Sequence, residues 1–129
     1  LTPELRNEAL YFRAKAYLNQ QADKKAMNDL QALAKDTRTL YGAEAKYLVA
    51  LQLYKAHEYA AAEKEILNFI EQSTPHAYWL ARSFILLSDV YVAMDKKLDA
   101  RQYLLSLQQN YHADDDIEQM INERLEKLK

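Results

Sequence analysis

The scarcity of residues that interrupt secondary structure is the strongest constraint on this chain. Its 129 residues include one glycine and two prolines. An all-β sandwich or barrel needs many turn residues, and a doubly wound α/β fold needs glycine at its strand-to-helix turns. Long helices with short connections remain, so we predict an all-α fold. The length is that of one domain with a core of its own.

Apolar residues recur at helical spacing along nearly the whole chain. Capping patterns at Thr2-Pro3-Glu4, Asp23, Ser73-Thr74-Pro75 and Asp114-Asp115-Asp116 mark the starts of four helices. We expect the first six helices at residues 3–20, 24–35, 42–56, 58–72, 75–94 and 97–111, and a seventh after the aspartates. Because the connections are short, consecutive helices are expected to be antiparallel neighbours.

A pattern of small and large residues repeats at offsets of 36 and then 38 residues. A small residue on the first helix of a pair and an alanine on the second would let two antiparallel backbones approach closely. One pair cannot cover its own apolar face, so pairs are expected to stack. The predicted repeats span residues 3–38, 39–74 and 75–112, and a mostly polar helix at 114–129 caps the stack. The aligned positions are Ala14, Tyr17, Ala26, Leu30 and Leu33; Ala50, Leu53, Ala62, Ile66 and Phe69; and Ser88, Tyr91, Ala100, Leu104 and Leu107.

This pattern resembles the tetratricopeptide repeat, although the units are longer than usual and lack the proline that closes each repeat. The stretches Glu63-Lys64-Glu65-Ile66-Leu67 and Tyr78-Trp79-Leu80-Ala81-Arg82 resemble the C-terminal repeats of large bacterial proteins of the Bacteroidetes kind. The resemblance implies a right-handed α-α superhelix (a solenoid) of three helix-turn-helix repeats plus the capping helix. It also implies a scaffold that holds a peptide or a partner's helix in a concave groove.

The family's groove positions, carried over to this chain, combine tyrosines with charges of both signs. The lysine and asparagine clamp of chaperone adaptors is absent, because Tyr11, Lys15 and Leu48 stand at the matching places. Tyrosine offers a large rigid contact with a polar tip, which suits a binding surface. The candidate partner-binding residues are Glu8, Tyr11, Lys15 and Leu18; Glu44, Tyr47, Leu51 and Tyr54; and Arg82, Ile85, Asp89 and Val92.

These tyrosines also have a purely structural interpretation. Tyr11, Tyr47 and Tyr54 could pack between repeats and hold the stack together without touching a partner. Trp79, the single tryptophan, is expected to pack between the second and third repeats. Both interpretations stay open on the sequence alone.

No constellation of residues predicts catalysis, a cofactor or a metal. A single glycine excludes glycine-rich phosphate loops, and cysteine is absent. His57, His76 and His112 are far apart in predicted connections, and Asp114 to Asp116 lack the alternating ligands of a calcium loop. Glu63 and Glu65 point to different sides of a helix. We therefore predict a protein that is not an enzyme and uses no cofactor.

The leading hypothesis is a protein-interaction module that binds a peptide or partner segment. The alternatives are a structural capping segment of a longer array, or self-association through an exposed N-terminal face; the start at Leu1 rather than methionine favours a fragment. A net charge of −2 argues against nucleic acid as a partner. No apolar run is long enough for a transmembrane segment.

Overall fold

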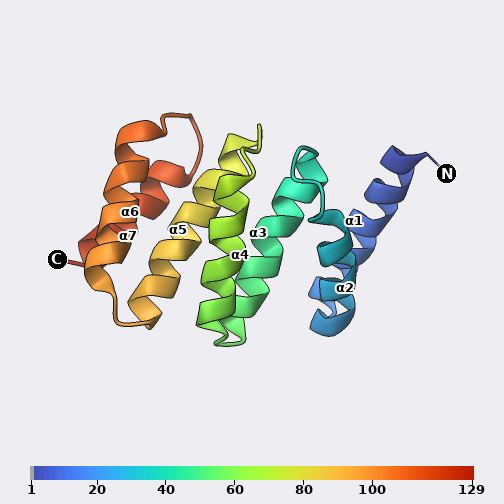
Figure 1. Cartoon of the computed structure of the whole chain (residues 1–129), viewed down its shortest axis with the longest axis horizontal. Helices are drawn as coiled ribbons and strands as arrows, with labels where there is room; N and C mark the ends of the chain where they lie inside the picture. The colour runs from blue at the N-terminus through green and yellow to red at the C-terminus, as the bar shows by residue number, and fades with distance from the viewer. Residues whose placement is uncertain (1) are drawn as a thin grey trace.

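The computed structural model describes residues 2–129, which form seven α-helices and no strand (Figure 1). The all-α prediction is thus confirmed. The helices lie side by side in a row that leads from one terminus to the other (Figure 1). They are α1 (Pro3–Asn19), α2 (Asp23–Leu33), α3 (Leu40–Lys55), α4 (Tyr59–Glu71), α5 (Ala77–Ala93), α6 (Lys97–Asn110) and α7 (Ile117–Lys127).

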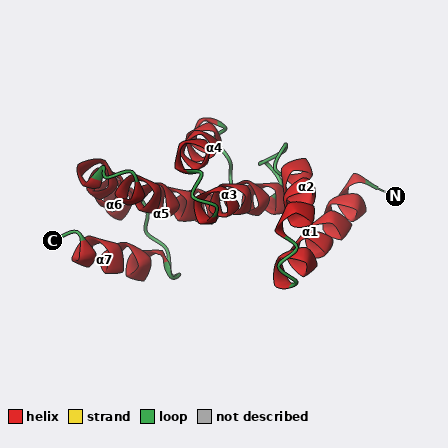
Figure 2. Ribbon diagram, turned by 90° about the horizontal axis from the view of Figure 1, so that it is seen from below, coloured by secondary structure: helices red, strands yellow, loops and turns green. Residues whose placement is uncertain are grey.

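The helices pair into three hairpins followed by a single helix. The hairpins are α1 with α2, α3 with α4, and α5 with α6. The first helix of each later pair packs against both helices of the hairpin before it, and α7 packs on α5 and α6 in the same way. Figure 2 shows α4 on one side of the row and α7 on the other. The helix α7 therefore covers the side of α5 that faces away from α4.

Small residues lie at the centre of each hairpin, as the aligned pattern predicts. Ala14, Ala50 and Ser88 on the first helices are at most 1% exposed. Ala26, Ala62 and Ala100 on the second helices have no exposed surface. Side chains this small let the two helix axes approach, and the aliphatic residues beside them fill the remaining space. The hydroxyl of Ser88 donates to the carbonyl of Ile85 at 2.6 Å, which satisfies it inside the core.

The turns inside the three hairpins have one geometry. Each is three residues long, and its middle residue has a positive φ of about 60°: Gln21, His57 and Asp95. The amide after each of these residues donates to a carbonyl five residues earlier, at Tyr17, Leu53 and Tyr91 respectively, over 2.7–2.9 Å. The aligned large residues at those three places thus sit where each turn closes.

The longer second repeat comes mainly from its second helix. In sequence the offset between aligned positions grows from 36 to 38 residues. The helix α4 extends nine residues past Ala62 to Glu71, whereas α2 extends seven past Ala26 to Leu33. The three-residue turns inside the hairpins are unchanged, so the added length lies at the C-terminal end of α4, opposite the turn. The aligned positions near the turns therefore keep the same spacing in each hairpin.

Two of the predicted helix starts are wrong in detail. Ser73-Thr74-Pro75 does not begin α5, which starts at Ala77. Instead, the Thr74 hydroxyl donates to the carbonyl of Thr37 at 2.7 Å, so this segment fastens one inter-hairpin connection to the preceding one. Asp23 is the first residue of α2 rather than its cap, and Ala22 at the cap has no side-chain bond to offer.

The other two starts follow the sequence signals closely. The hydroxyl of Thr2 accepts a hydrogen bond from the amide of Leu5 at 3.2 Å, and Pro3 opens α1. At α7 the capping carboxylate belongs to Asp115, which accepts from the amide of Ile117 at 2.9 Å. Asp116, directly before the helix, instead accepts from the hydroxyl of Tyr78 at 2.8 Å.

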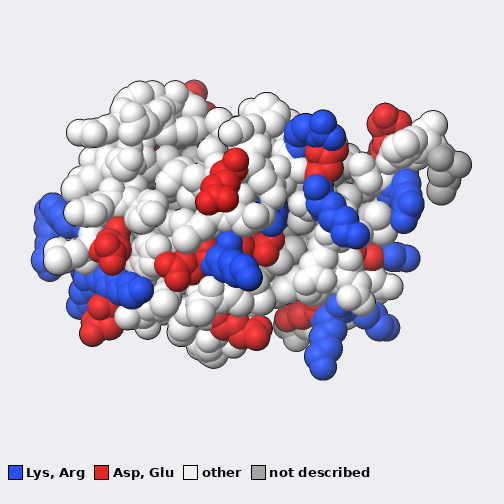
Figure 3. All heavy atoms as spheres, in the orientation of Figure 1, with Lys and Arg blue, Asp and Glu red and all other residues white. Residues whose placement is uncertain are grey.

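Charges of both signs are interspersed over the face formed by α2, α4 and α6 (Figure 3). Neither sign gathers into a continuous patch there, which matches the net charge of −2. Within residues 2–129, no helix has both the length and the apolar character needed to cross a membrane.

Candidate functional site

The predicted groove residues all lie on α1, α3 and α5, the first helices of the three hairpins. We call the surface that carries them the first-helix face. Three groups of contacts run along this face, between α1 and α3, between α3 and α5, and between α5 and α7. These contacts decide which predicted residues have surface left for a partner.

The first group joins α1 to α3 through a buried carboxylate. Glu44 is 8% exposed. Its side chain accepts hydrogen bonds from the Tyr11 hydroxyl, at 3.0 and 3.1 Å to its two oxygens, and from Lys15 Nζ at 3.0 Å. The Tyr11 ring also stacks on Tyr41, with 4.4 Å between ring centroids. A buried charge is tolerated because a cation and a hydroxyl both face it.

The second group joins α3 to α5 around an arginine. Arg82 donates to the Tyr47 hydroxyl at 3.1 Å and to the Tyr78 hydroxyl at 3.0 Å. Its guanidinium also lies 5.1 Å from the centre of the Tyr47 ring. Trp79 packs beside them, with its ring 5.5 Å from that of Tyr47, so the prediction that it lies between the second and third repeats is confirmed.

The third group joins α5 to α7. Asp89 accepts two hydrogen bonds from Arg124, at 2.8 and 3.0 Å, in a bidentate pair. Ile85 shares a buried apolar cluster with Ile117 and Ile121 of α7. The capping helix therefore covers part of the first-helix face that α5 contributes.

Several predicted groove residues are consequently structural. Tyr47 is 6% exposed and Ile85 1%, and Glu44 is buried as described above. Little of their surface can touch a partner, and the packing interpretation describes Tyr47 well. The predicted residues that retain exposed or half-exposed surface are Glu8, Tyr11, Lys15, Leu18, Leu51, Tyr54, Arg82, Asp89 and Val92.

A hollow of about 510 Å³ opens where α3, α5, α6 and α7 meet. Its volume is in the range of about 300–1,000 Å³ that ligand sites occupy. Tyr54, Asp89 and Val92, which are all predicted to contact a partner, lie in its wall. Three cations and two carboxylates line it. Asp89 and Arg124 pair with each other, which leaves Lys97, Lys127 and Glu123. The full lining is Tyr54, Ser88, Asp89, Val92, Lys97, Leu104, Glu123, Arg124, Lys127 and Leu128.

Comparison with known proteins adds no family to this geometry: no family model, no curated protein and no solved structure matches the chain.

The residues that sequence reasoning missed lie on α6, on α7 and at the C-terminal cap of α7. Lys97, Arg124, Lys127 and Leu128 complete the hollow. The sequence pattern predicts only that the seventh helix ends the stack, and it assigns the basic residues of this helix to no binding surface. The available signal was their spacing: residues three and four apart share a helix side, so Arg124, Lys127 and Leu128 lie together.

Within the part of the chain that the structure describes, no three histidine, aspartate or glutamate side chains are grouped so that they could hold a metal ion. The three histidines lie in connections between helices, as predicted. His57 contacts the Tyr59 hydroxyl at 2.7 Å, and His76 contacts the carbonyl of Arg38 at 2.9 Å. His112 contacts the carbonyl of Gln109 at 3.0 Å. These contacts are local links at helix ends.

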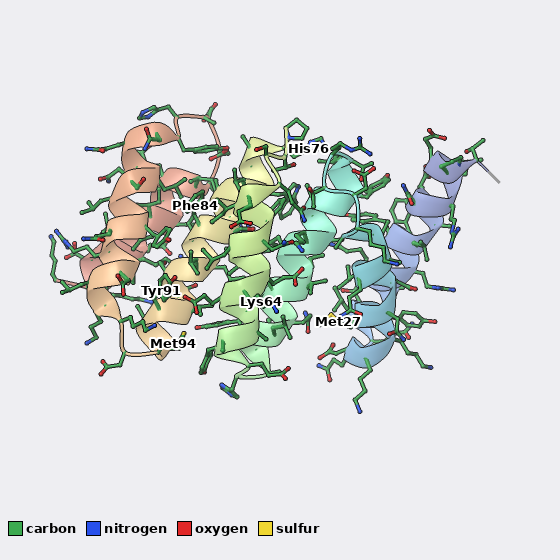
Figure 4. All side chains as sticks on the ribbon, viewed as in Figure 1. Met27, Lys64, His76, Phe84, Tyr91 and Met94 are labelled. Carbon is green, nitrogen blue, oxygen red and sulfur yellow. The ribbon has the colours of Figure 1, made fainter. Side chains whose placement is uncertain are left out.

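Burial and the hydrogen bond to Glu44 raise the pKa of Tyr11 to about 12. Burial and the Glu63 carboxylate likewise raise the pKa of Tyr91, which lies near the end of α5 (Figure 4). An unfolded tyrosine has a pKa of about 10, so the folded chain holds these hydroxyls protonated when the unfolded chain has lost the proton. The contribution of Tyr11 to stability is complete below about pH 10 and is lost as the pH rises through its folded pKa of about 12; the contribution of Tyr91 has the same sign.

We therefore expect the melting temperature to fall steeply between about pH 10 and pH 12. The melting temperature of Tyr11→Phe should fall less steeply over the same range, because this variant lacks one of the hydroxyls whose ionisation destabilises the fold. Thermal denaturation followed by circular dichroism at several pH values measures both curves. Curves of equal slope would contradict the role assigned to Tyr11, whatever the difference in stability at neutral pH.

Proposed function

We propose that this chain is a non-enzymatic scaffold of the tetratricopeptide kind that binds a segment of a partner protein. Its three hairpins and α7 would then form the right-handed superhelix of that family, with residues 3–38, 39–74 and 75–112 as repeats. Two observations support the assignment. The aligned small residues are buried in all three hairpins, and the three turns share one geometry.

The hollow beside Tyr54 is the observation that carries the binding proposal. It lies on the first-helix face, at the end where α7 stops the row. Its wall combines apolar surface from Tyr54, Val92 and Leu128 with the ammonium groups of Lys97 and Lys127. Such a site would take an apolar side chain of an extended or helical segment, with a neighbouring carboxylate placed near the two lysines.

The half-exposed residues farther along the face would extend this contact. Leu51 lies one turn before Tyr54 on α3, and Leu18 lies near the end of α1. The side chain of Lys15 is 43% exposed although its ammonium group reaches Glu44. A segment that runs from the hollow toward α1 would therefore meet apolar surface first and a cation after it.

Selection of short random peptides displayed on phage, with the folded chain as bait, tests this function. We expect enrichment of peptides that carry an acidic residue close to a large apolar one. The double variant Lys97→Glu/Lys127→Glu should lose at least about tenfold in affinity for such a peptide, because two exposed attractive charges become repulsive.

Lys64→Glu is the matched control. Lys64 is exposed on α4 (Figure 4) and does not line the hollow, so this variant should bind as the unaltered chain does. Circular dichroism should show equal helicity in all three proteins. No enriched peptide, or equal affinity of the double variant, would refute a binding site at this hollow.

A further inference from the structure

The outer side of α1 carries an uncovered apolar stripe. Leu5, Ala9, Phe12 and Ala16 follow one another at steps of four, three and four residues, which places them on one side of the helix. Leu5 is 52% exposed and Phe12 59%, and the two alanines are exposed as well. Within residues 2–129 the Tyr11 ring lies edge-on to Phe12 at 5.3 Å, but no helix covers the stripe: α1 contacts only α2 and α3, and these residues stay exposed.

The same positions are covered in the other two hairpins. Ala45 and Leu48 of α3 correspond to Ala9 and Phe12, and they are 0% and 8% exposed. Ser83 and Leu86 of α5 correspond in turn, at 0% and 3%. Ala45, Leu48 and Leu86 belong to the main buried cluster, and α3 and α5 each pack on the hairpin before them. The stripe on α1 therefore continues, at the end of the row, an interface that the molecule already uses twice.

We propose that a second copy of this chain covers the stripe, with the two α1 helices antiparallel about a twofold axis. Large and small residues alternate along the stripe. An antiparallel pairing places Leu5 against Ala16 of the second copy and Phe12 against Ala9 of the second copy. Each large side chain then meets a small one, so the two helices can approach closely along the whole stripe.

The charges beside the stripe suit this pairing. Glu8 and Lys15 lie on the same edge, and the twofold axis brings each opposite the other residue of the second copy, where Lys15 also keeps its bond to Glu44 at 3.0 Å. Arg6 and Arg13 lie on the other edge, where the dimer would bring like charges together. The repulsion is reduced because Arg13 is paired with Asp29 at 2.6 Å.

The opposite end of the row does not offer an alternative surface. The outward side of α7 carries exposed polar residues, among them Glu118, Gln119, Glu123 and Glu126. An apolar stripe would gain little by packing there, so head-to-tail growth into a filament is disfavoured. A closed dimer through α1 is the arrangement that buries Leu5 and Phe12 on both copies at once.

One helix from each copy makes a small interface, so the association is expected to be weak. Interfaces that bury less than about 1,200 Å² in total are typical of transient complexes. The surface is separate from the hollow beside Tyr54, so dimerisation and peptide binding can fail independently.

Sedimentation velocity over a concentration series from roughly 10 µM to 1 mM, the range in which weak complexes form, measures the association. We expect the sedimentation coefficient to rise from that of a monomer toward that of a dimer. Phe12→Glu should remain monomeric throughout. Leu98→Glu introduces the same change at a residue of α6 that is 80% exposed, and it should dimerise like the unaltered chain.

Disulfide trapping tests the antiparallel orientation, since the chain has no cysteine of its own. In the proposed dimer Leu5→Cys and Ala16→Cys meet when the two single variants are mixed. Two copies of Leu5→Cys alone hold their thiols about 16 Å apart along the helix axis, beyond disulfide reach. We therefore expect cross-linking of the mixture and little of Leu5→Cys by itself.

The proposal would be overturned if the sedimentation coefficient stayed at the monomer value at every concentration. A different protein segment would then be the candidate to cover the stripe. A dimer that persists in Phe12→Glu would place the interface elsewhere. Efficient cross-linking of Leu5→Cys alone would contradict the antiparallel pairing.

Discussion

Replacing Ala62 by leucine is expected to lower the free energy of unfolding by about 1–3 kcal/mol, because a larger side chain has no room at this point. Ala62 lies on α4 with no exposed surface, in one buried cluster with Ala50 of α3. Leucine would push the two helices apart or adopt a strained rotamer. Since α5 packs on both helices of this hairpin, the displacement would also disturb the next repeat.

Ala61→Leu provides the comparison for this variant. Ala61 is the preceding residue of the same helix and is exposed, so leucine there meets solvent. Both variants change helix propensity equally, and only one adds volume to the core. Urea denaturation of the two proteins measures the difference. A loss of stability in Ala61→Leu equal to that in Ala62→Leu would show that volume at the hairpin centre is not the cause.

The small-residue pattern was predictable because it reflects a local requirement. Two antiparallel helices joined by a three-residue turn must approach near that turn, and only small side chains permit this. Ala14 with Ala26 and Ala50 with Ala62 therefore recur at one spacing within each hairpin. Their positions follow from helix geometry and the hairpin turn, without knowledge of how the hairpins pack on one another.

The turns themselves were less visible in the sequence. A position with positive φ is usually occupied by glycine, yet Gln21, His57 and Asp95 adopt that conformation here. The closing hydrogen bond to the carbonyl five residues earlier offsets the strain of a side chain at positive φ. Scarcity of glycine correctly excluded β folds, but it gave no sign of where the left-handed residues would be.

The sequence does not show which residues of the predicted groove keep exposed surface. Tyr54 and Asp89 lie in the wall of the hollow, whereas Tyr47 is buried by contacts with Trp79 and Arg82. Whether a tyrosine at such a position is free depends on residues from the next repeat. The same reason explains why Arg124, which comes from α7, was missed. Contacts between residues 35 apart are set by the packing of hairpins, which single-helix patterns do not encode.

Gly42→Ala should also destabilise the fold, by about 1–3 kcal/mol, the usual cost of forcing extra atoms into a packed region. Gly42 lies in the first turn of α3 and is buried. A Cβ atom at this position would clash with the backbone carbonyl oxygen of Asp36 and would come within 2.7 Å of the Thr39 hydroxyl. That hydroxyl caps α3 by accepting from the Gly42 amide at 2.9 Å, so relief of the clash would disturb the cap.

Whether Gly42→Ala lowers or raises the free energy of unfolding shows whether the connection before α3 is held in place. In an exposed helix interior, alanine is more favourable than glycine by about 1 kcal/mol. Ala61→Gly on α4 measures that ordinary preference in this protein, since Ala61 is exposed. If the connection before α3 could move away freely, Gly42→Ala would stabilise the chain by a similar amount. A lower urea midpoint for Gly42→Ala, beside the ordinary loss in Ala61→Gly, would show that the connection is held in place. The bonds from Thr37 to Gln72 at 2.7 Å and from Thr74 to the Thr37 carbonyl, which tie it to the next connection, supply the restraint.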